Sequence, residues 1–396
     1  MGITSVLQVM LAGPYRHAIK VLCAAALAFA GYAFPQEEKR SVLKDPQDGK
    51  LDASEWLLDK KGFLPVPIII TEPAIGYGAG LVLTFFRQSI GEELERSRNT
   101  GHVVPPDIYA LALAATENGT QFLGGGGMVS FDEDRWRWRG FVARADVNLD
   151  YYGAGGQLGT GDLKIGYNLD GWISSQQLLR RLGESNNYVA LRSIWLDFNT
   201  SFDPVLQRPV VMPRTSGLTS SGISVAFEHD SRDNIFTPSR GVKTSVEATF
   251  FSPEIGSDDK FQLYRAWFLG YVPLGKELVL GGRVDARTSS GDVPFYQQPY
   301  IELRGIPAAR YQDQSVGMAE AELRWNVTPR WALIGFAGGG RAWGTDKNFG
   351  DADTVWTKGV GFRYLIARRL GFYMGADVAR GPENTAFYIQ AGSAWR

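Results

Sequence analysis

The chain has 396 residues, enough for one large domain or two ordinary ones. Its 41 basic and 42 acidic residues nearly cancel, which indicates neither a basic nucleic-acid-binding surface nor an acidic disordered tail. Glycine is abundant, at 47 residues, and aromatic residues make up 12% of the chain, a mixture that suits many strands and turns better than helices.

The N-terminus has the pattern of a cleaved secretory signal. A positive region ends at Lys20, an apolar stretch covers 21–30, and a small-x-small cleavage site ends at Ala33. The apolar stretch is too short to cross a bilayer. We therefore expect 1–33 to be a signal peptide, with a membrane anchor as the alternative. The single cysteine, Cys23, lies in this stretch, so the exported chain would hold no disulfide and no thiolate metal site.

Residues 34–62 are polar and are expected to form a short periplasmic lead. Asp52 would cap a short helix, with Glu55 at the third helical position as in a capping box. The same stretch half-resembles a calcium loop, but Lys44 and Pro46 occupy two positions that need carboxylates. A turn followed by a helix cap is therefore the preferred interpretation.

From Phe63 onward the hydrophobicity alternates with a period of two. No later segment holds ~18 uninterrupted apolar residues, so no membrane-spanning helix is predicted. A membrane protein without such helices must close its backbone hydrogen bonds as a barrel. The pattern predicts sixteen strands, at 64–71, 75–87, 106–116, 120–131, 135–149, 159–171, 186–199, 219–229, 241–252, 259–272, 276–289, 315–328, 331–343, 355–367, 370–380 and 385–396.

The alternation is clear within 243–250, where Val246, Ala248 and Phe250 share one face and mostly polar residues occupy the other. In a membrane barrel the polar face is turned inward and the apolar face outward. A soluble sandwich also alternates, but it does not need an apolar face on nearly every strand of an exported chain. The expected fold is all-β, a 16-stranded antiparallel transmembrane β-barrel over 63–396.

Connection lengths also alternate, because the short turns of such a barrel face the periplasm and the longer loops face outward. Turns at 329–330 and 368–369 are short, and the connection 290–314 is long. The connections at 88–105 and 172–185 are long yet fall on the periplasmic side, so the strand register is least secure there.

The segment FEHDSRDNIFTPSRG joins two predicted strands. As a plain periplasmic turn, Arg232 would neutralise Asp230 or Asp233, Pro238 would fix φ, and Gly241 would permit a left-handed conformation. The segment also resembles the RD-x-x-x-x-P-x-x-G element of the bacterial surface antigen superfamily, whose members include BamA and TamA.

A second motif, LRGIP, lies in the long connection 290–314 and resembles the [VL]-R-G-[FYI] signature of the sixth surface loop in the same superfamily. There the loop folds back into the barrel and its arginine contacts acidic side chains of the inner wall. A guanidinium suits this task because it carries several donors and a fixed charge. The resemblance implies a loop clamp of Arg304 and Gly305 with Glu322, and with Glu320 in reserve. Without the resemblance, Arg304 would be read as a solvated loop charge.

Two strands depart from or extend the family pattern. In GFAGGGRAW, Gly338 stands where the superfamily has an aspartate, so a clamp with two acidic strands is in doubt. The last strand resembles the C-terminal signal that the barrel-assembly machinery reads. Its outward residues would be Phe387, Ile389 and Trp395, and Arg396 extends one residue past the usual terminal aromatic.

Members of the superfamily typically carry periplasmic POTRA repeats, where clients dock, but roughly 29 residues separate the expected cleavage site from the first strand. The chain thus resembles a barrel-only member. The resemblance implies help with the insertion or translocation of proteins at the outer membrane, with lipid and a client or periplasmic protein as partners. Pro65 and Pro67 would loosen a seam at the first strand, or merely mark the lead into the barrel. The alternative function is a passive pore or structural barrel for small solutes or lipids.

No catalytic, cofactor or metal site is predicted. The histidines are His17, His102 and His229. A Ser–His–Asp site of Ser231, His229 and Asp230 is disfavoured, because adjacent residues at a strand end point apart. The sequence has no G-x-S-x-G element and no cluster with metal-ligand spacing. We therefore expect a barrel that is not an enzyme and that needs no cofactor.

Overall fold

The computed structural model describes residues 43–100, 104–152, 164–203, 218–345 and 347–395. The predicted signal peptide, the first part of the lead, His102 and Arg396 lie outside the described residues.

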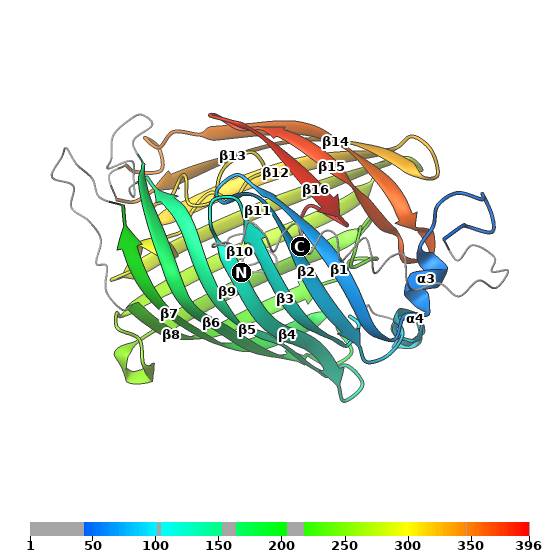
Figure 1. The fold of residues 1–396 in the computed structure, drawn as a ribbon, viewed down its shortest axis with the longest axis horizontal. Helices are drawn as coiled ribbons and strands as arrows, with labels where there is room; N and C mark the ends of the chain where they lie inside the picture. The colour runs from blue at the N-terminus through cyan, green and yellow to red at the C-terminus, as the bar shows by residue number, and fades with distance from the viewer. Residues whose placement is uncertain (1–42, 101–103, 153–163, 204–217, 346, 396) are drawn as a thin grey trace.

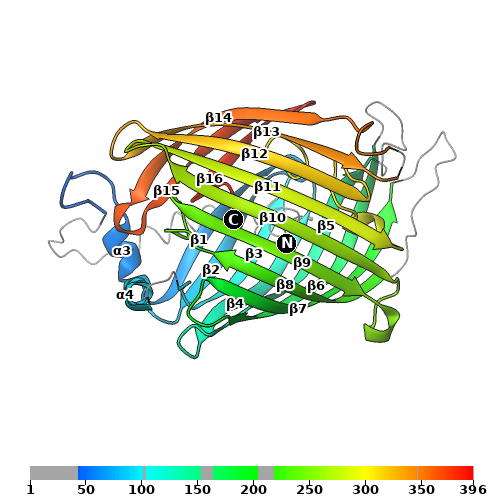
Figure 2. The same cartoon turned by 180° about the vertical axis from the view of Figure 1, so that it is seen from behind.

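The described residues form one sixteen-stranded sheet that curls into a barrel, in which each strand pairs with its neighbours in sequence order (Figures 1 and 2). Every pairing is antiparallel, which confirms the predicted fold class. The strands are β1 (Gly62–Glu72), β2 (Gly76–Phe86), β3 (Ile108–Thr116), β4 (Gln121–Phe131), β5 (Trp136–Tyr151), β6 (Ile165–Arg181), β7 (Asn187–Phe202), β8 (Leu218–Asp230), β9 (Gly241–Phe251), β10 (Phe261–Pro273), β11 (Leu278–Gly291), β12 (Ser315–Asn326), β13 (Trp331–Trp343), β14 (Val355–Ala367), β15 (Phe372–Arg380) and β16 (Thr385–Ala391).

Short helices connect or precede some strands. The helices α3 (Ser54–Leu58) and α4 (Ile90–Thr100) lie at one end of the barrel (Figure 1). Among the described residues, no helix is long and apolar enough to cross a membrane. The part of the chain that the structure describes also holds three single turns of 3₁₀ helix, η2 (Pro253–Ile255), η3 (Phe295–Gln297) and η4 (Arg368–Leu370).

The alternating pattern sorts side chains between the outside and the lumen. On β9, Val246 is 60% exposed on the outer surface, whereas Ser245 is 3% exposed and faces inward. On β12, Leu323 and Trp325 are exposed while Glu320 is buried. Successive side chains of a strand point to opposite faces, so the apolar set forms the outer surface that lipid would cover.

The strand β6 differs from its prediction. The sequence pattern placed a strand at 159–171 and a loop at 172–185, but β6 continues to Arg181 and pairs with β7 up to that residue. The polar run Ser-Ser-Gln-Gln suggested a loop, yet alternation persists through it, with Ile173 and Leu179 buried. The β6–β7 connection is therefore only 182–186, a short turn like its neighbours. The connection 87–107 holds α4 and lies at the end that carries the short turns, which we call the periplasmic end.

The predicted capping box does not form. The helix α3 begins at Ser54 and its N-cap is Ala53, without a side-chain cap. Asp52 instead accepts the backbone N–H of Ser54 at 2.7 Å, and Glu55 pairs with Arg369 at 2.8 Å. Asp52 thus accepts one N–H of the first turn, but Glu55 is directed away from it, and the Asp52 N–H donates to the Leu43 carbonyl instead, so the reciprocal bond of a capping box is missing.

A seam separates the first and last strands, which lie side by side (Figure 1). Among the described residues, the hydrogen-bonded ladder runs from β1 to β16 and does not continue from β16 back to β1. Pro65 and Pro67 lie within β1 and face Leu83 and Leu81 of β2 without a break in that pairing. A proline is tolerated in a strand where its missing N–H would face an unpaired edge, so both prolines turn that side to the seam.

The C-terminal strand is shorter than predicted. The pairing of β16 with β15 ends at Ala391, opposite Met374, and Gly392 has a φ of +80°. From there the chain turns into the barrel, and the Ser393 N–H donates to the Phe236 carbonyl at 2.7 Å. At the periplasmic end of the seam, β15 is therefore not covered by a paired residue of β16.

Candidate functional site

The long β11–β12 connection, residues 292–314, crosses the lumen. On one side, Phe295 packs edge-on against Tyr151 and Tyr167, with ring centroids 5.5 and 5.1 Å apart. On the same wall, the amide of Gln297 donates to Ser220 at 2.7 Å. The motif LRGIP lies on the opposite side, where Ile301, Leu303 and Ile306 are buried against β12. We call this connection the lumen loop.

Arg304 of the lumen loop meets three carboxylates of the inner wall. Its Nε lies 2.7 Å from Glu320, its Nη2 lies 2.8 Å from Glu322, and its Nη1 lies 2.9 Å from Asp377. The guanidinium also lies over the Phe336 ring, 3.5 Å from its centroid. Because Arg304 is buried, these charges are removed from water, and such a cluster is stable only when its donors and acceptors are well matched.

Gly305 allows the close approach that this arrangement needs. Its φ is +92°, a conformation that L side chains rarely adopt. A Cβ at this position would lie 2.9 Å from the backbone nitrogen of Gly381. The Gly305 N–H donates to the Tyr388 hydroxyl at 2.9 Å, which joins the loop to β16.

Asp377 is the functional residue that sequence reasoning missed. Gly338 of β13 stands where the superfamily has an aspartate, but the second acidic strand is β15, which carries Asp377. A Cβ at position 338 would lie 3.1 Å from Cγ of Glu320, so a larger side chain there would crowd that carboxylate. Asp377 is the one acidic residue of β15 and pairs with Arg363 of β14 at 2.6 Å. An inward carboxylate diagonal to an inward arginine on the neighbouring strand was the signal available in the sequence.

A second ion cluster holds the lumen loop at Glu302, two residues before Arg304. Glu302 pairs with Arg287 at 2.5 Å, and Arg287 also pairs with Asp285 at 2.9 Å. Asp285 is fully buried and further contacts Arg265 and Arg283 at 2.6 and 3.2 Å. This cluster was not predicted from the sequence, because its members are spread over two strands and the loop.

The β8–β9 turn holds the other motif. Arg232 pairs with Asp230 through two hydrogen bonds of 2.8 Å, so Asp230 and not Asp233 is the partner of this arginine. Asp233 accepts the backbone N–H groups of Ser239 and Arg240 at 2.9 and 3.2 Å, which closes the turn on itself.

The end of this turn is tightly packed. Gly241 has a φ of +99°, and a Cβ there would lie 2.2 Å from the Ser231 carbonyl oxygen. The Pro238 carbonyl accepts a hydrogen bond of 3.1 Å from Arg324 of β12. Asn234 donates to the Leu370 carbonyl at 2.8 Å. The turn therefore reaches across the periplasmic end to β12 and η4, which are far from it in sequence.

The residues predicted for the C-terminal signal do not share one face. Phe387 and Ile389 are exposed on the outer surface. Trp395, expected to face outward, is 4% exposed and turned inward, and its indole N–H donates to Glu320 at 2.6 Å. The inward turn at Gly392 causes this difference, since it carries the last residues off the wall and to a buried carboxylate that needs a donor.

The residues around His229 do not assemble a hydrolytic site. The His229 Nδ1 contacts the Asn187 side chain at 2.8 Å. The Ser231 hydroxyl donates to the Val242 carbonyl at 3.3 Å, and Asp230 is engaged by Arg232. Within the described ranges, no group of three or more His, Cys, Asp or Glu residues could hold a metal ion.

The comparisons with known proteins agree with this geometry. The Omp85 superfamily domain matches residues 132–371, which include both motifs. No curated protein matches the chain. The BamA structure from Haemophilus ducreyi lacking POTRA domains 1–3 is similar with a TM-score of 0.57 at 13% identity, over 84% of this chain and 70% of that chain.

Two further solved structures share the fold. CdiB from Escherichia coli has a TM-score of 0.55 at 12% identity, over 82% of this chain and 61% of that chain. CdiB from Acinetobacter baumannii has a TM-score of 0.52 at 13% identity, over 83% of this chain and 59% of that chain. The chain thus spans only about three fifths of either CdiB. The superfamily match covers more than half of this chain and confirms the resemblance inferred from the two motifs. This outer-membrane β-barrel belongs to the Omp85 superfamily.

Proposed function

We propose that this barrel assists the insertion or translocation of proteins at the outer membrane, and that the β1–β16 seam is where it acts. The observation that carries the proposal is the interrupted ladder at the seam. An unpaired strand edge is a template for pairing with a strand of another chain. Pro65 and Pro67 support this role, because they remove donors that would otherwise help β1 to pair with β16.

The loop that crosses the lumen also favours the seam over a central passage. The lumen loop is held on one wall by the aromatic cluster around Phe295 and on the other by Arg304. A polypeptide crossing through the lumen would have to displace both anchors. A client strand that pairs at the edge of β1 would displace neither.

The proposal includes a division of the chain. Residues 1–33 would be removed as a signal peptide, 34–62 would be a periplasmic lead, and 63–396 would form the barrel. The clamp of Arg304, Gly305, Glu320 and Glu322 would hold the lumen loop in place. Outer-membrane lipid would surround the barrel, and an unfolded client or a periplasmic carrier protein would be its partner.

The test is a folding assay in liposomes. The purified barrel is reconstituted, and the folding of a urea-unfolded outer-membrane barrel is followed by its heat-modifiable migration on gels. We expect faster client folding than in empty liposomes or in liposomes that contain an unrelated porin-type barrel. Equal rates in all three would overturn the proposal. Ion conductance without faster folding would instead support the passive pore.

A further inference from the structure

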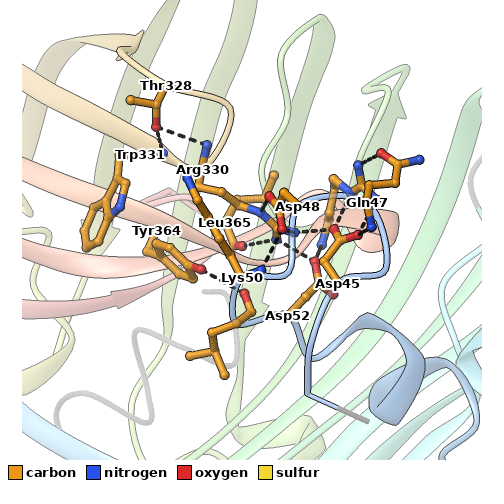
Figure 3. A network of polar contacts seen from close by, with 12 residues as sticks. Asp45, Gln47, Asp48, Lys50, Asp52, Thr328, Arg330, Trp331, Tyr364 and Leu365 are labelled. Carbon is orange, nitrogen blue, oxygen red and sulfur yellow. Dashed lines mark hydrogen bonds and ion pairs between the residues drawn. The ribbon is translucent and has the colours of Figure 1, made fainter. Parts of the chain in front are cut away.

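The lead directly precedes β1, which forms one side of the seam. It nevertheless contacts the barrel wall on the other side of the seam. Arg330, in the β12–β13 turn, is fully buried, and all three carboxylates that contact it come from the lead (Figure 3). Its Nε lies 2.7 Å from Asp48 and its Nη1 lies 2.5 Å from Asp52, while Asp45 contacts Nη2. The Leu365 carbonyl accepts a further hydrogen bond of 3.0 Å from Nη1.

The end of β14 and the β14–β15 connection supply a second set of contacts to the lead. The Arg368 guanidinium lies 2.8 Å from Asp45, and its backbone N–H donates to Asp52 at 3.1 Å. The remaining hydrogen bonds join Ala53 N–H to the Ile366 carbonyl at 2.6 Å, Arg369 N–H to the Ser54 hydroxyl at 3.0 Å, and the Tyr364 hydroxyl to the Leu51 carbonyl at 2.8 Å. The acidic lead thus meets a basic rim.

The C-terminal end of the lead, which contains α3, packs against β1. Leu58 of α3 is buried in one apolar cluster with residues from both sides of the seam. Leu64 of β1 and Phe86 of β2 belong to one side, and Ala367 and Leu370 belong to the other. Figures 1 and 2 both place α3 between the periplasmic ends of β1 and β15. Only residues 59–61 separate α3 from β1.

The lead takes this position at the level where β16 has left the wall. The pairing of β16 ends opposite Met374, and Phe372, two residues closer to the periplasmic end, packs against the lead's apolar cluster. We propose that residues 43–59 are a latch that ties β1 to β14–β15 across the periplasmic end of the seam, and that the seam opens there only when the latch undocks from Arg330.

The site of the ion cluster makes undocking reversible. Arg330 lies in a turn at the end of the barrel, and the carboxylates that cover it belong to the lead. When the lead leaves, water can hydrate the guanidinium and the freed aspartates, so no charge stays buried without a partner. The sequence of this stretch half-resembles a calcium loop. In the structure its aspartates do surround a cation, but that cation is the guanidinium of Arg330.

The test measures the width of the seam in the reconstituted full-length protein, without a client. In a Cys23→Ser background, spin labels are placed at Phe63→Cys on β1, which is 74% exposed, and at Met374→Cys on β15. Pulsed electron resonance should give one narrow distance. The variant Asp45→Asn/Asp48→Asn/Asp52→Asn alters only the lead and should add a longer, broader population, and Arg330→Ala should do the same.

Two controls separate seam motion from general loosening. The variant Asp351→Asn/Asp353→Asn removes two exposed charges from the β13–β14 connection and should leave the distance unchanged. A label pair at Val360→Cys and Met374→Cys, on the paired strands β14 and β15, should keep its distance in every variant. Heat-modifiable migration verifies that each variant retains a folded barrel.

An unchanged distance between β1 and β15 in both latch variants would overturn the latch. That the latch controls access of a client to the seam rests on the proposed function. The opening of the seam when the latch undocks does not depend on that function. The spin-label distances can therefore refute the latch while the liposome assay supports the proposed function. Equally, the liposome assay can refute the proposed function while the distances support the latch.

Discussion

Arg304 and Arg330 each meet three carboxylates, yet their surroundings differ. Arg304 lies inside the barrel, where its partners stand on strands of the wall. Arg330 lies at the periplasmic end, where its partners stand on the lead. Removing one member of a buried cluster leaves an uncompensated charge, whereas undocking the whole lead would expose both Arg330 and its aspartates to water. We therefore expect a structural role for the first arginine and a movable contact for the second.

The first prediction concerns Arg304→Ala. The change leaves the carboxylates of Glu320, Glu322 and Asp377 without their main counter-charge, which should lower the free energy of unfolding by about 3–5 kcal/mol. The barrel should then lose its heat-modifiable gel band at a lower temperature than the parent. The control is Arg380→Ala, which removes an exposed arginine from β15. An identical melting profile for the parent and Arg304→Ala would refute a stabilising clamp.

The second prediction concerns the pH dependence of the lead. The hydrogen bond from Arg330 lowers the pKa of Asp48 to about 2. A carboxylate whose pKa is lowered by docking stabilises the docked state above its ordinary pKa of about 4, and this stabilisation is lost as the pH falls toward 2. A spin label at Leu43→Cys in the Cys23→Ser background should stay immobilised from pH 8 to pH 5 and become mobile below about pH 4. In Asp48→Asn the acid-induced change should be smaller. Release centred near neutral pH would contradict this account.

At the level of elements, the lumen loop and the β8–β9 turn close the barrel from opposite ends. The loop joins the wall near β5–β8 to β12, β15 and β16, and the turn joins β8–β9 to β12 and η4. Each depends on one glycine with a positive φ where neighbouring backbone approaches closely. These two segments are the superfamily motifs, so the motif residues are those that let a connection fold back over the barrel.

The third prediction follows from the course of the lumen loop. Replacing 293–313 with a short Gly-Ser turn removes both anchors and should open an aqueous path, because the segment that spans the lumen between its two walls is gone. Conductance in planar bilayers should rise well above that of the parent. Shortening 344–354, a connection at the same end, is the matched control and should leave conductance low. Equal conductance in both variants would mean that the loop does not block the lumen.

At the level of the whole molecule, the fold persists although little sequence is shared. The similarity to BamA has a TM-score of 0.57 at 13% identity. A barrel requires alternation and closure of backbone hydrogen bonds, and many residue combinations meet both conditions. In this chain the seam combines two prolines on β1, a β16 that ends early and a lead that crosses the gap. The liposome folding assay and the spin-label distances both test how this seam behaves in the whole barrel.

The sequence by itself determined the sixteen strands, the inward and outward faces and the two motifs, because alternation and turn chemistry are local properties of the chain. It misjudged β6, where polar residues interrupt the apolar character without interrupting the period. Only the tertiary structure decided which charges meet. Asp377 reaches Arg304 across 73 positions, and Asp48 reaches Arg330 across 282. Those pairs exist because closure of the barrel brings β12–β15 beside the lead and the loop, and no local pattern in the chain encodes that proximity.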